Sequence, residues 1–161
     1  MDFYGINTKA NITASGTPDL GSSGNPFNDL FGCASSAEWG DLAEKYKCKG
    51  DFEKGSVMCV SKDPLFDLEE CNEDLSTSYI GVVSTKPGFK MNNALKDGDF
   101  IGLTGLLPTR IVGPINKGDF IVATVSGCAR AGKDHEILHK IGVANETNTN
   151  EGIKTVVCII K

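Results

Sequence analysis

The stretch His135-Glu136-Ile137-Leu138-His139 holds both histidines of the 161-residue chain and fits the pattern His-Glu-x-x-His. On an α-helix this spacing puts two histidines on one face, where they bind zinc while the glutamate acts as general base of a metalloprotease. Gly132 and Gly142 bracket the motif and leave room for about two helical turns. The motif makes a zinc-dependent peptidase one alternative function.

The alternative for the same stretch is structural. Ile137 and Leu138 would then pack inward while His135 and His139 face water. A catalytic zinc needs three protein ligands on a rigid frame, and few residues follow that could supply the third. We therefore expect no stoichiometric zinc on His135 and His139, and no cofactor.

Three carboxylates, Glu38, Asp41 and Glu44, surround the single tryptophan, Trp39. A carboxyl group buried beside an indole ring has its pKa raised by desolvation, and it can then act as an acid or a base on a nearby peptide bond. The alternative is that all three are solvated or bind neighbouring loops. They are the candidate catalytic residues if this chain cleaves itself.

The segment around these carboxylates is short and interrupted. Trp39, Leu42 and Tyr46 follow a spacing that one helical face could use, but Gly40 argues against a stable helix. We expect a hinge-like segment that inserts Trp39 into the core. The Gly-Lys pair within residues 130–134 lacks the spacing of a phosphate-binding loop, so that stretch is expected to be an exposed loop.

Composition excludes several functions. The formal net charge is −5 and no block of basic residues occurs, which disfavours nucleic-acid binding. No run of sequence approaches the length of a transmembrane helix, so we expect no membrane association. The six cysteines include no Cys-x-x-Cys pair. Cys59 and Cys158 lie in apolar runs and are expected to be free, buried side chains of a protein made in a reducing compartment.

Most of the chain reads as short strands rich in Val, Ile, Phe and Thr, separated by Gly, Pro or Asn. This pattern predicts an all-β fold, a compact barrel or sandwich. The expected strands are 55–60, 79–84, 99–105, 109–112, 119–125 and 154–160. The expected single core contains Trp39, Val57, Ile80, Val82, Ile101, Ile121, Val156 and Ile159.

Residues 1–34 differ from the rest and are expected to form an extended N-terminal arm before a β domain of residues 35–161. The arm contains apolar residues such as Phe3, Tyr4, Phe27 and Phe31, but it is too rich in Gly, Ser and Asn to form its own core. We expect it to become ordered only against a neighbouring subunit, where its aromatic side chains are buried.

Several motifs carry a family resemblance. Residues 37–46, Ala-Glu-Trp-Gly-Asp-Leu-Ala-Glu-Lys-Tyr, and residues 19–31, which begin Asp-Leu-Gly-Ser-Ser, resemble elements of phage tail-fibre and tail-spike (appendage) C-terminal domains. Residues 80–84, 102–108 and 112–119 are similar to later segments of the same family. The order of these motifs, which together cover residues 19–161, is the stronger argument. Some members are intramolecular chaperones that cut themselves from the spike, the peptidase G2-like type.

The resemblance implies a virion structural protein, assembled in the host cytoplasm, that forms a homotrimer and contacts other virion proteins. It also implies self-cleavage by Glu38, Asp41 or Glu44. Only 37 residues precede Glu38. The chain is therefore expected to be either the C-terminal piece of a longer protein or a virion protein that kept the fold and lost the scissile bond.

Overall fold

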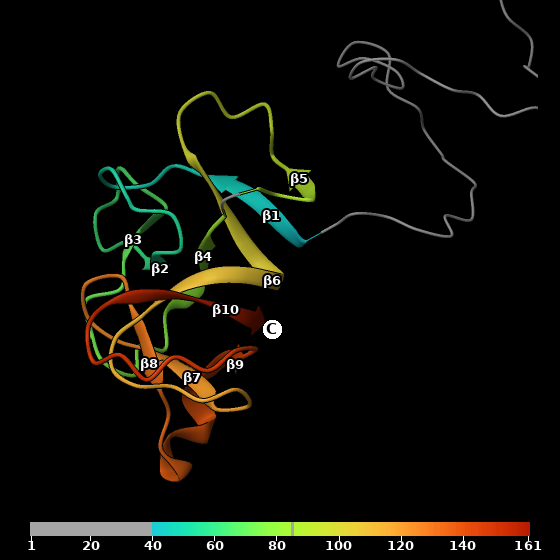
Figure 1. The fold of residues 1–161 in the computed structure, drawn as a ribbon. Coiled ribbons are helices and arrows are strands. Elements are labelled where there is room, and N and C mark those ends of the chain that lie inside the picture. The colour runs from blue at the N-terminus through green and yellow to red at the C-terminus, as the bar shows by residue number, and fades with distance from the viewer. Residues whose placement is uncertain (1–39, 85) are drawn as a thin grey trace, which may run out of the picture. The chain divides into compact units, whose positions relative to one another are not determined.

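The computed structural model describes residues 40–84 and 86–161. This part of the chain consists of β-strands and one short 3-10 helix (Figure 1). The elements are β1 (Asp41–Tyr46), β2 (Val57–Val60), β3 (Leu68–Glu70), β4 (Tyr79–Val83), β5 (Phe89–Met91), β6 (Asp99–Ile111), β7 (Phe120–Ala123), β8 (Ala129–Ala131), η1 (Asp134–His139), β9 (Lys140–Ala144) and β10 (Lys154–Ile160). The all-β prediction is confirmed. The predicted arm and its boundary lie outside the described residues.

Strand β6, with 13 residues, connects the two halves of the fold. Its first part pairs with β1 and β4, and its last part pairs with β10. Figure 1 shows this long strand reaching from β1 to β10. The change of partner falls at Gly105, which pairs with both Asp41 and Ile160 and has a φ of +122°. Glycine adopts this φ without the strain that a side chain would add, so the strand can turn there.

The sequence predicted two strands on either side of Leu106-Leu107-Pro108, and this was wrong. These three residues continue β6 and pair with Ile159, Cys158 and Val157 of β10. Proline is a poor strand residue because it lacks an N–H group, but it is tolerated where no ladder bond is needed. Pairing with β10, a tertiary contact, therefore overrides the local turn signal.

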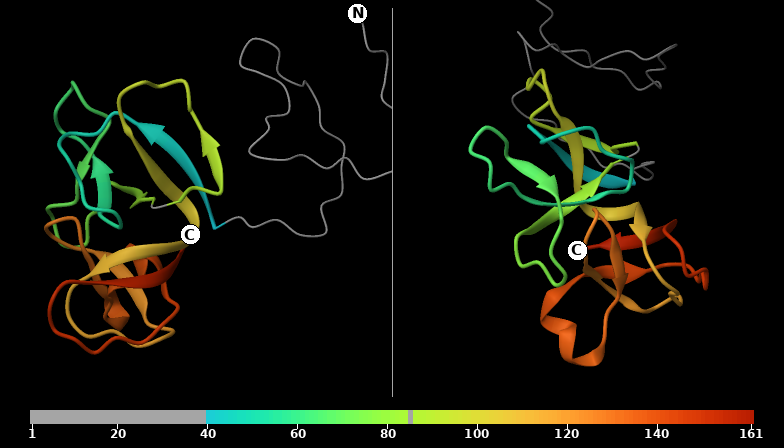
Figure 2. Two further views of the ribbon diagram at one scale, coloured as in Figure 1. Left: turned by 45° about the horizontal axis from the view of Figure 1, so that its top comes forward. Right: turned by 90° about the vertical axis from the view of Figure 1, so that its left-hand side faces the viewer.

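Five strands close a small barrel in the order β10-β9-β7-β8-β6, because β6 also pairs with β10. The contact between β6 and β8 is one parallel pair, Ile111 with Ala129. In Figure 2 the orange and red barrel strands lie together, apart from the cyan and green strands β1, β2 and β3. The buried cluster here includes Leu107, Ile111 and Ile160, each at most 1% exposed. None of the helices in the described residues is long and apolar enough to cross a membrane.

The remaining strands extend the sheet from β6 through β4 and β2 to β3, with β1 and β5 on the other edge of β6. They cover a second, smaller buried cluster formed by Met58, Leu68, Val83 and Ile101. Strand β4 serves both clusters, because Val82 packs in the larger one and Val83 in the smaller one. Successive residues of a strand point to opposite faces, so a strand covered on both sides belongs to two cores.

The prediction of a single core is therefore corrected to two clusters. Four of the predicted core residues are fully buried in the larger cluster: Val57, Val82, Ile121 and Val156. Ile101 is buried in the smaller cluster and Ile80 packs against it. Ile159 is 37% exposed because it lies on the outer face of β10, and Trp39 lies outside the described residues.

Strands β1, β5, β8 and β9 were not predicted. The expected hinge around Gly40 is instead followed directly by β1, whose residues pair with β6 on one side and β5 on the other. Strands β5 and β8 have three residues each, too few to show an alternating pattern. Their conformation follows from pairing with neighbours rather than from local propensity.

Cys59 and Cys71 form a disulfide, with Cα atoms 5.0 Å apart. The expectation that Cys59 is a free thiol was wrong: it is buried, but bonded. The pairing arises because β2 and β3 are antiparallel, and the N–H of Cys71 donates to the carbonyl of Val57. Cys158 is the free, buried side chain that was expected, and burial raises the pKa of its thiol to about 11.

The disulfide closes a loop of sequence separation 12, so its loss should lower the free energy of unfolding by about 3 kcal/mol. Urea unfolding of the native protein with and without a thiol reductant measures this difference. The double variant Cys59→Ala/Cys71→Ala should unfold earlier than wild type and respond no further to reductant. Equal midpoints for the oxidised and reduced protein would contradict the prediction.

Candidate functional site

Asp41, the first residue of β1, lies where β1, β6 and the loop of residues 86–88 meet. The N–H of Gly88 donates to the backbone carbonyl of Asp41 at 3.1 Å and to its Oδ1 at 3.2 Å. The preceding residue, Gly40, accepts from the N–H of Leu106 at 2.9 Å. The loop and β6 thereby hold the Asp41 carboxylate in a defined position.

This carboxylate is buried, with the residue only 7% exposed. Its Oδ2 is buried and has no hydrogen-bond partner among the described residues. Space for it is left by Gly102, since a Cβ atom there would lie 3.0 Å from Oδ2. Gly102 is opposite Ala43 of β1 and Val82 of β4, so a larger side chain would press on both the carboxylate and the core.

Ser84 follows β4 directly and is 3% exposed. Its Oγ is also buried and, within the described part of the chain, has no hydrogen-bond partner. Asp41 and Ser84 line one cavity of about 290 Å³, together with residues 86–88 and 106–108. Buried polar groups normally have partners, so two unpaired ones on residues that line the same cavity mark this place as a candidate functional site.

Of the other predicted catalytic residues, Glu44 lies on β1 and Glu38 lies outside the described residues. Asp41 and Glu44 are separated by three positions on a strand, so their side chains point to opposite faces. Glu44 accepts a hydrogen bond from the hydroxyl of Tyr46 at 2.9 Å. Burial, assisted by Glu44, raises the pKa of Tyr46 to about 12. The structure thus does not bring the two carboxylates together.

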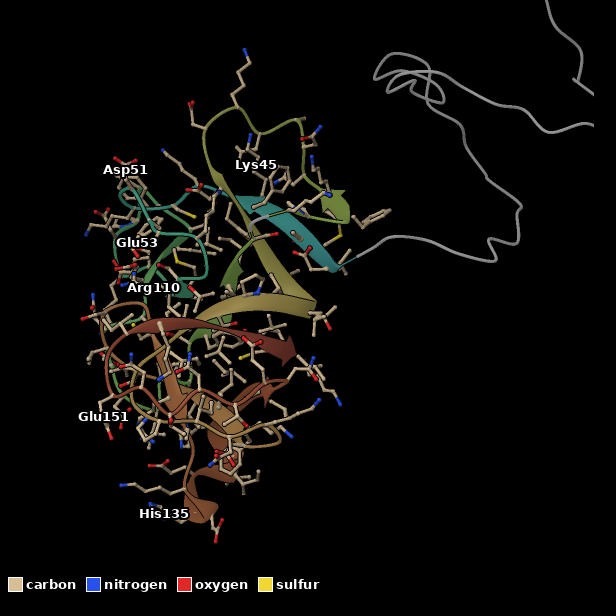
Figure 3. The ribbon with its side chains drawn as sticks, viewed as in Figure 1. Lys45, Asp51, Glu53, Arg110, His135 and Glu151 are labelled. Carbon is tan, nitrogen blue, oxygen red and sulfur yellow. A yellow bond between two sulfur atoms is a disulfide. The ribbon has the colours of Figure 1, made fainter. Side chains whose placement is uncertain are left out.

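The His-Glu-x-x-His motif forms the 3-10 helix η1 rather than an α-helix. With three residues per turn, positions i and i+4 point about 120° apart instead of sharing a face. The side chain of His135 is 77% exposed, at the η1 end of the described β domain (Figure 3). In residues 40–84 and 86–161 no group of three or more His, Cys, Asp or Glu side chains is placed to hold a metal ion. The absence of zinc remains a prediction.

The glutamate of the motif is occupied by other contacts. Glu136 is 5% exposed and accepts hydrogen bonds from Arg130 at 2.8 and 3.0 Å, and from the backbone N–H of Lys133 at 2.8 Å. These bonds lower the pKa of Glu136 to about 2, with the Arg130 bond as the largest cause. A carboxylate held in this way is a poor general base.

Arg130 was missed by the sequence analysis, which placed it in an exposed loop. It lies on β8 and also binds Asp74 through two hydrogen bonds of 2.9 and 2.7 Å. One guanidinium therefore joins β8, η1 and the loop before β4. No local signal marks this contact, since Asp74 is 56 residues away in sequence. Ser84 was also missed, because a single serine after a strand is unremarkable.

The comparisons with known proteins give a fold and no family. No known family matches the sequence, and no curated protein matches it. Among solved structures, the chain is similar to the pre-mature gene product 12 of bacteriophage phi29, with a TM-score of 0.62 and 16% identity. That match covers 85% of this chain and 24% of the phi29 chain, so this chain spans about a quarter of that protein.

The chain is also similar to the C-terminal fragment of bacteriophage phi29 gene product 12. The TM-score is 0.57 at 18% identity, and the match covers 75% of this chain and 100% of the fragment. At these identities the likeness shows a shared fold. The described β domain therefore has the architecture of that C-terminal fragment.

The low pKa of Glu136 predicts a stability change in acid. Its folded pKa of about 2 lies below its usual value of 4.5, so its contribution to stability is complete above pH 4.5 and is lost as the pH falls through about 2. Urea unfolding from pH 6 downwards should therefore show a smaller acid-induced loss in Glu136→Gln, whose stability at about pH 6 is already reduced. The control is Glu151→Gln, an exposed side chain, which should follow wild type. Parallel curves for all three proteins would contradict the prediction.

Proposed function

We propose that this chain is the C-terminal module of a phage virion appendage and that it works by assembling with copies of itself. The observation that carries the proposal is the fold shared with the whole of the phi29 gene product 12 C-terminal fragment. The fibre-type motifs of the sequence agree with it. Location in the virion and contact with other virion proteins follow from the same proposal.

Apolar residues on the outer face of the barrel support self-association. Leu106 is 47% exposed and Ile159 is 37% exposed, and they face each other across β6 and β10. Phe89 of β5, 52% exposed, lines an apolar groove with Leu42 and Gly105 on the neighbouring strands. Exposed apolar surface of this kind is typical of interfaces between proteins. We assign these residues and the arm of residues 1–34 to the interface, and a trimer is the oligomer that the fibre resemblance implies.

We expect the full chain to be a trimer in light scattering at micromolar concentration. The double variant Leu106→Glu/Ile159→Glu should weaken association, because it places two carboxylates of each chain, six in a trimer, against apolar surface. Leu65→Glu is the matched control, since Leu65 is 68% exposed on a loop and should tolerate the charge. A chain starting at Ser35 tests the arm.

The assembly proposal fails if the full chain is a monomer at this concentration. The role of the arm fails if the chain starting at Ser35 keeps an unchanged oligomer. Association that is unaffected by Leu106→Glu/Ile159→Glu would exclude this face of the barrel as the interface.

The finer proposal is that the module cuts its own chain, as an intramolecular chaperone of the peptidase G2-like type does. The supporting observation is the buried Asp41 carboxylate, which has one unpaired oxygen and belongs to a residue that lines a cavity. Such a group can take a proton from an attacking water and return it to the leaving amine. Glu38 and Glu44 remain the other candidates for this role.

Intact-mass measurement of the incubated protein tests self-cleavage. The wild-type chain should lose a peptide from its 17.1 kDa mass, whereas Asp41→Asn should keep the full mass. Glu38→Gln and Glu44→Gln, measured in parallel, identify which carboxylate acts. Wild-type protein that keeps its full mass after prolonged incubation in its assembled state would refute self-cleavage of this chain.

A further inference from the structure

Two cavities share lining residues at the start of β1, because Gly40 and Asp41 line both of them. The first cavity, of about 440 Å³, is lined also by strand residues: Leu42, Phe89, Thr104 and Gly105. The second, of about 290 Å³, is lined also by Ser84, residues 86–88 and residues 106–108. Gly40 is the first residue that the structure describes, and Trp39 before it is the only tryptophan of the chain. Consecutive Cα atoms lie about 3.8 Å apart, so Trp39 is within reach of both cavities.

Strand alternation decides which cavity the side chain of Trp39 can enter. Asp41 and Ala43 are buried whereas Leu42 is partly exposed, so neighbouring positions of β1 point to opposite faces. The ladder with β6 continues to Gly40, whose carbonyl accepts from the N–H of Leu106. An extended backbone that continues by one more residue puts Trp39 on the face of Asp41.

The face of Asp41 is the side of the second cavity. The carboxylate Oδ1 of Asp41 accepts from the N–H of Gly88, which belongs to the loop that lines this cavity. The first cavity is lined instead by Leu42 and Thr104, which lie opposite each other in the β1–β6 ladder. Position 38 shares the face of Leu42, and its glutamate is unsuited to an apolar groove because burying a charge is costly.

The lining of the second cavity suits an indole ring. Its walls include two prolines and two leucines: Pro87, Pro108, Leu106 and Leu107. A volume of about 290 Å³ is near the lower limit of small-molecule sites, roughly 300 Å³, and is suited to a single ring system. A tryptophan side chain buries about 150–250 Å² when it is covered, so moving it from water into an apolar cavity is favourable.

We propose that the side chain of Trp39 occupies the second cavity, which is then the docking site for the segment that precedes β1. The ring lies between the loop of residues 86–88 and residues 106–108 of β6. The contact fixes the direction in which the preceding chain leaves the β domain. The occupant is Trp39 of the same chain, because one peptide bond joins it to Gly40, which lines the cavity. The inference rests neither on assembly nor on self-cleavage.

Nuclear magnetic resonance of the ¹³C,¹⁵N-labelled full chain tests the contact directly. The single indole N–H gives one signal, which identifies the ring protons of Trp39. These protons should show nuclear Overhauser contacts to the methyl groups of Leu107 and to the ring protons of Pro87. Contacts to Leu42 and Thr104 in place of these would assign the ring to the first cavity and overturn the proposal.

Fluorescence of the single tryptophan tests the cavity wall. The native chain should emit at a shorter wavelength than the urea-unfolded chain and be quenched less by acrylamide. Pro87→Ala, which removes part of the wall, should shift the emission to longer wavelength and increase the quenching. Pro64→Ala is the matched control, because Pro64 is exposed on another loop and its loss should leave the emission unchanged.

Removing the ring tests its effect on the β domain. Trp39→Ala should lower the urea midpoint of unfolding, because it leaves the cavity empty. It should also shift the amide signal of Gly88 through the loss of the ring current, and Trp39→Phe should have smaller effects. If Trp39→Ala does not fold, the wild-type contacts and the comparison of Pro87→Ala with Pro64→Ala decide.

A mixture of labelled and unlabelled chains identifies the source of the ring. Contacts that arise only between labelled and unlabelled chains would assign the ring to a second copy and overturn the proposal, whereas contacts within the labelled chain support it. Native emission and quenching equal to those of the urea-unfolded chain would also overturn it. A monomeric chain that shows the contacts would support docking while contradicting the assembly role.

Discussion

The structure depends on one strand, β6, forming ladders with different partners along its length. Over its first residues it pairs with β1 and β4, and beyond Gly105 it pairs with β10. A strand that belongs to two parts of a sheet must turn between them, and it can do so only where the backbone is free of side-chain clashes. Gly102 and Gly105 supply that freedom, because Cβ atoms at both positions would press on Asp41.

The candidate site is a consequence of this constraint. A cavity lies beside the turn of β6, and it is lined by Asp41, Ser84 and the loop of residues 86–88. Buried polar atoms that would be unfavourable inside either core are placed at the junction between them. The same junction exposes apolar side chains on the outer face, and this connects the site with the surface that we assign to association.

The charged groups that meet at Arg130, beside η1, are all paired, unlike the carboxylate of Asp41. Arg130 joins Asp74 and Glu136 and so fixes η1 against β8. Each carboxylate there has its pKa lowered by the guanidinium, and the cluster is satisfied. Asp41 differs, because one of its oxygens is unpaired. We therefore interpret the Arg130 cluster as structural and the surroundings of Asp41 as the candidate functional site. The His-Glu-x-x-His pattern belongs to the first kind in this structure, because its glutamate is bound to Arg130.

The sequence by itself determined the all-β class, the course of β2, β4 and β10, and the burial of Val57, Val82, Ile121 and Val156. These features follow from local alternation and β-branched composition, which act over a few residues. Only the tertiary structure decided the continuation of β6 through Pro108, the Cys59–Cys71 bond and the three-residue strands. It also decided the partners of Arg130 and the meeting of Asp41 with Ser84 at one cavity. Each of these joins residues distant in sequence, and their energy comes from contacts that exist only after the sheet has closed, so no local pattern could reveal them.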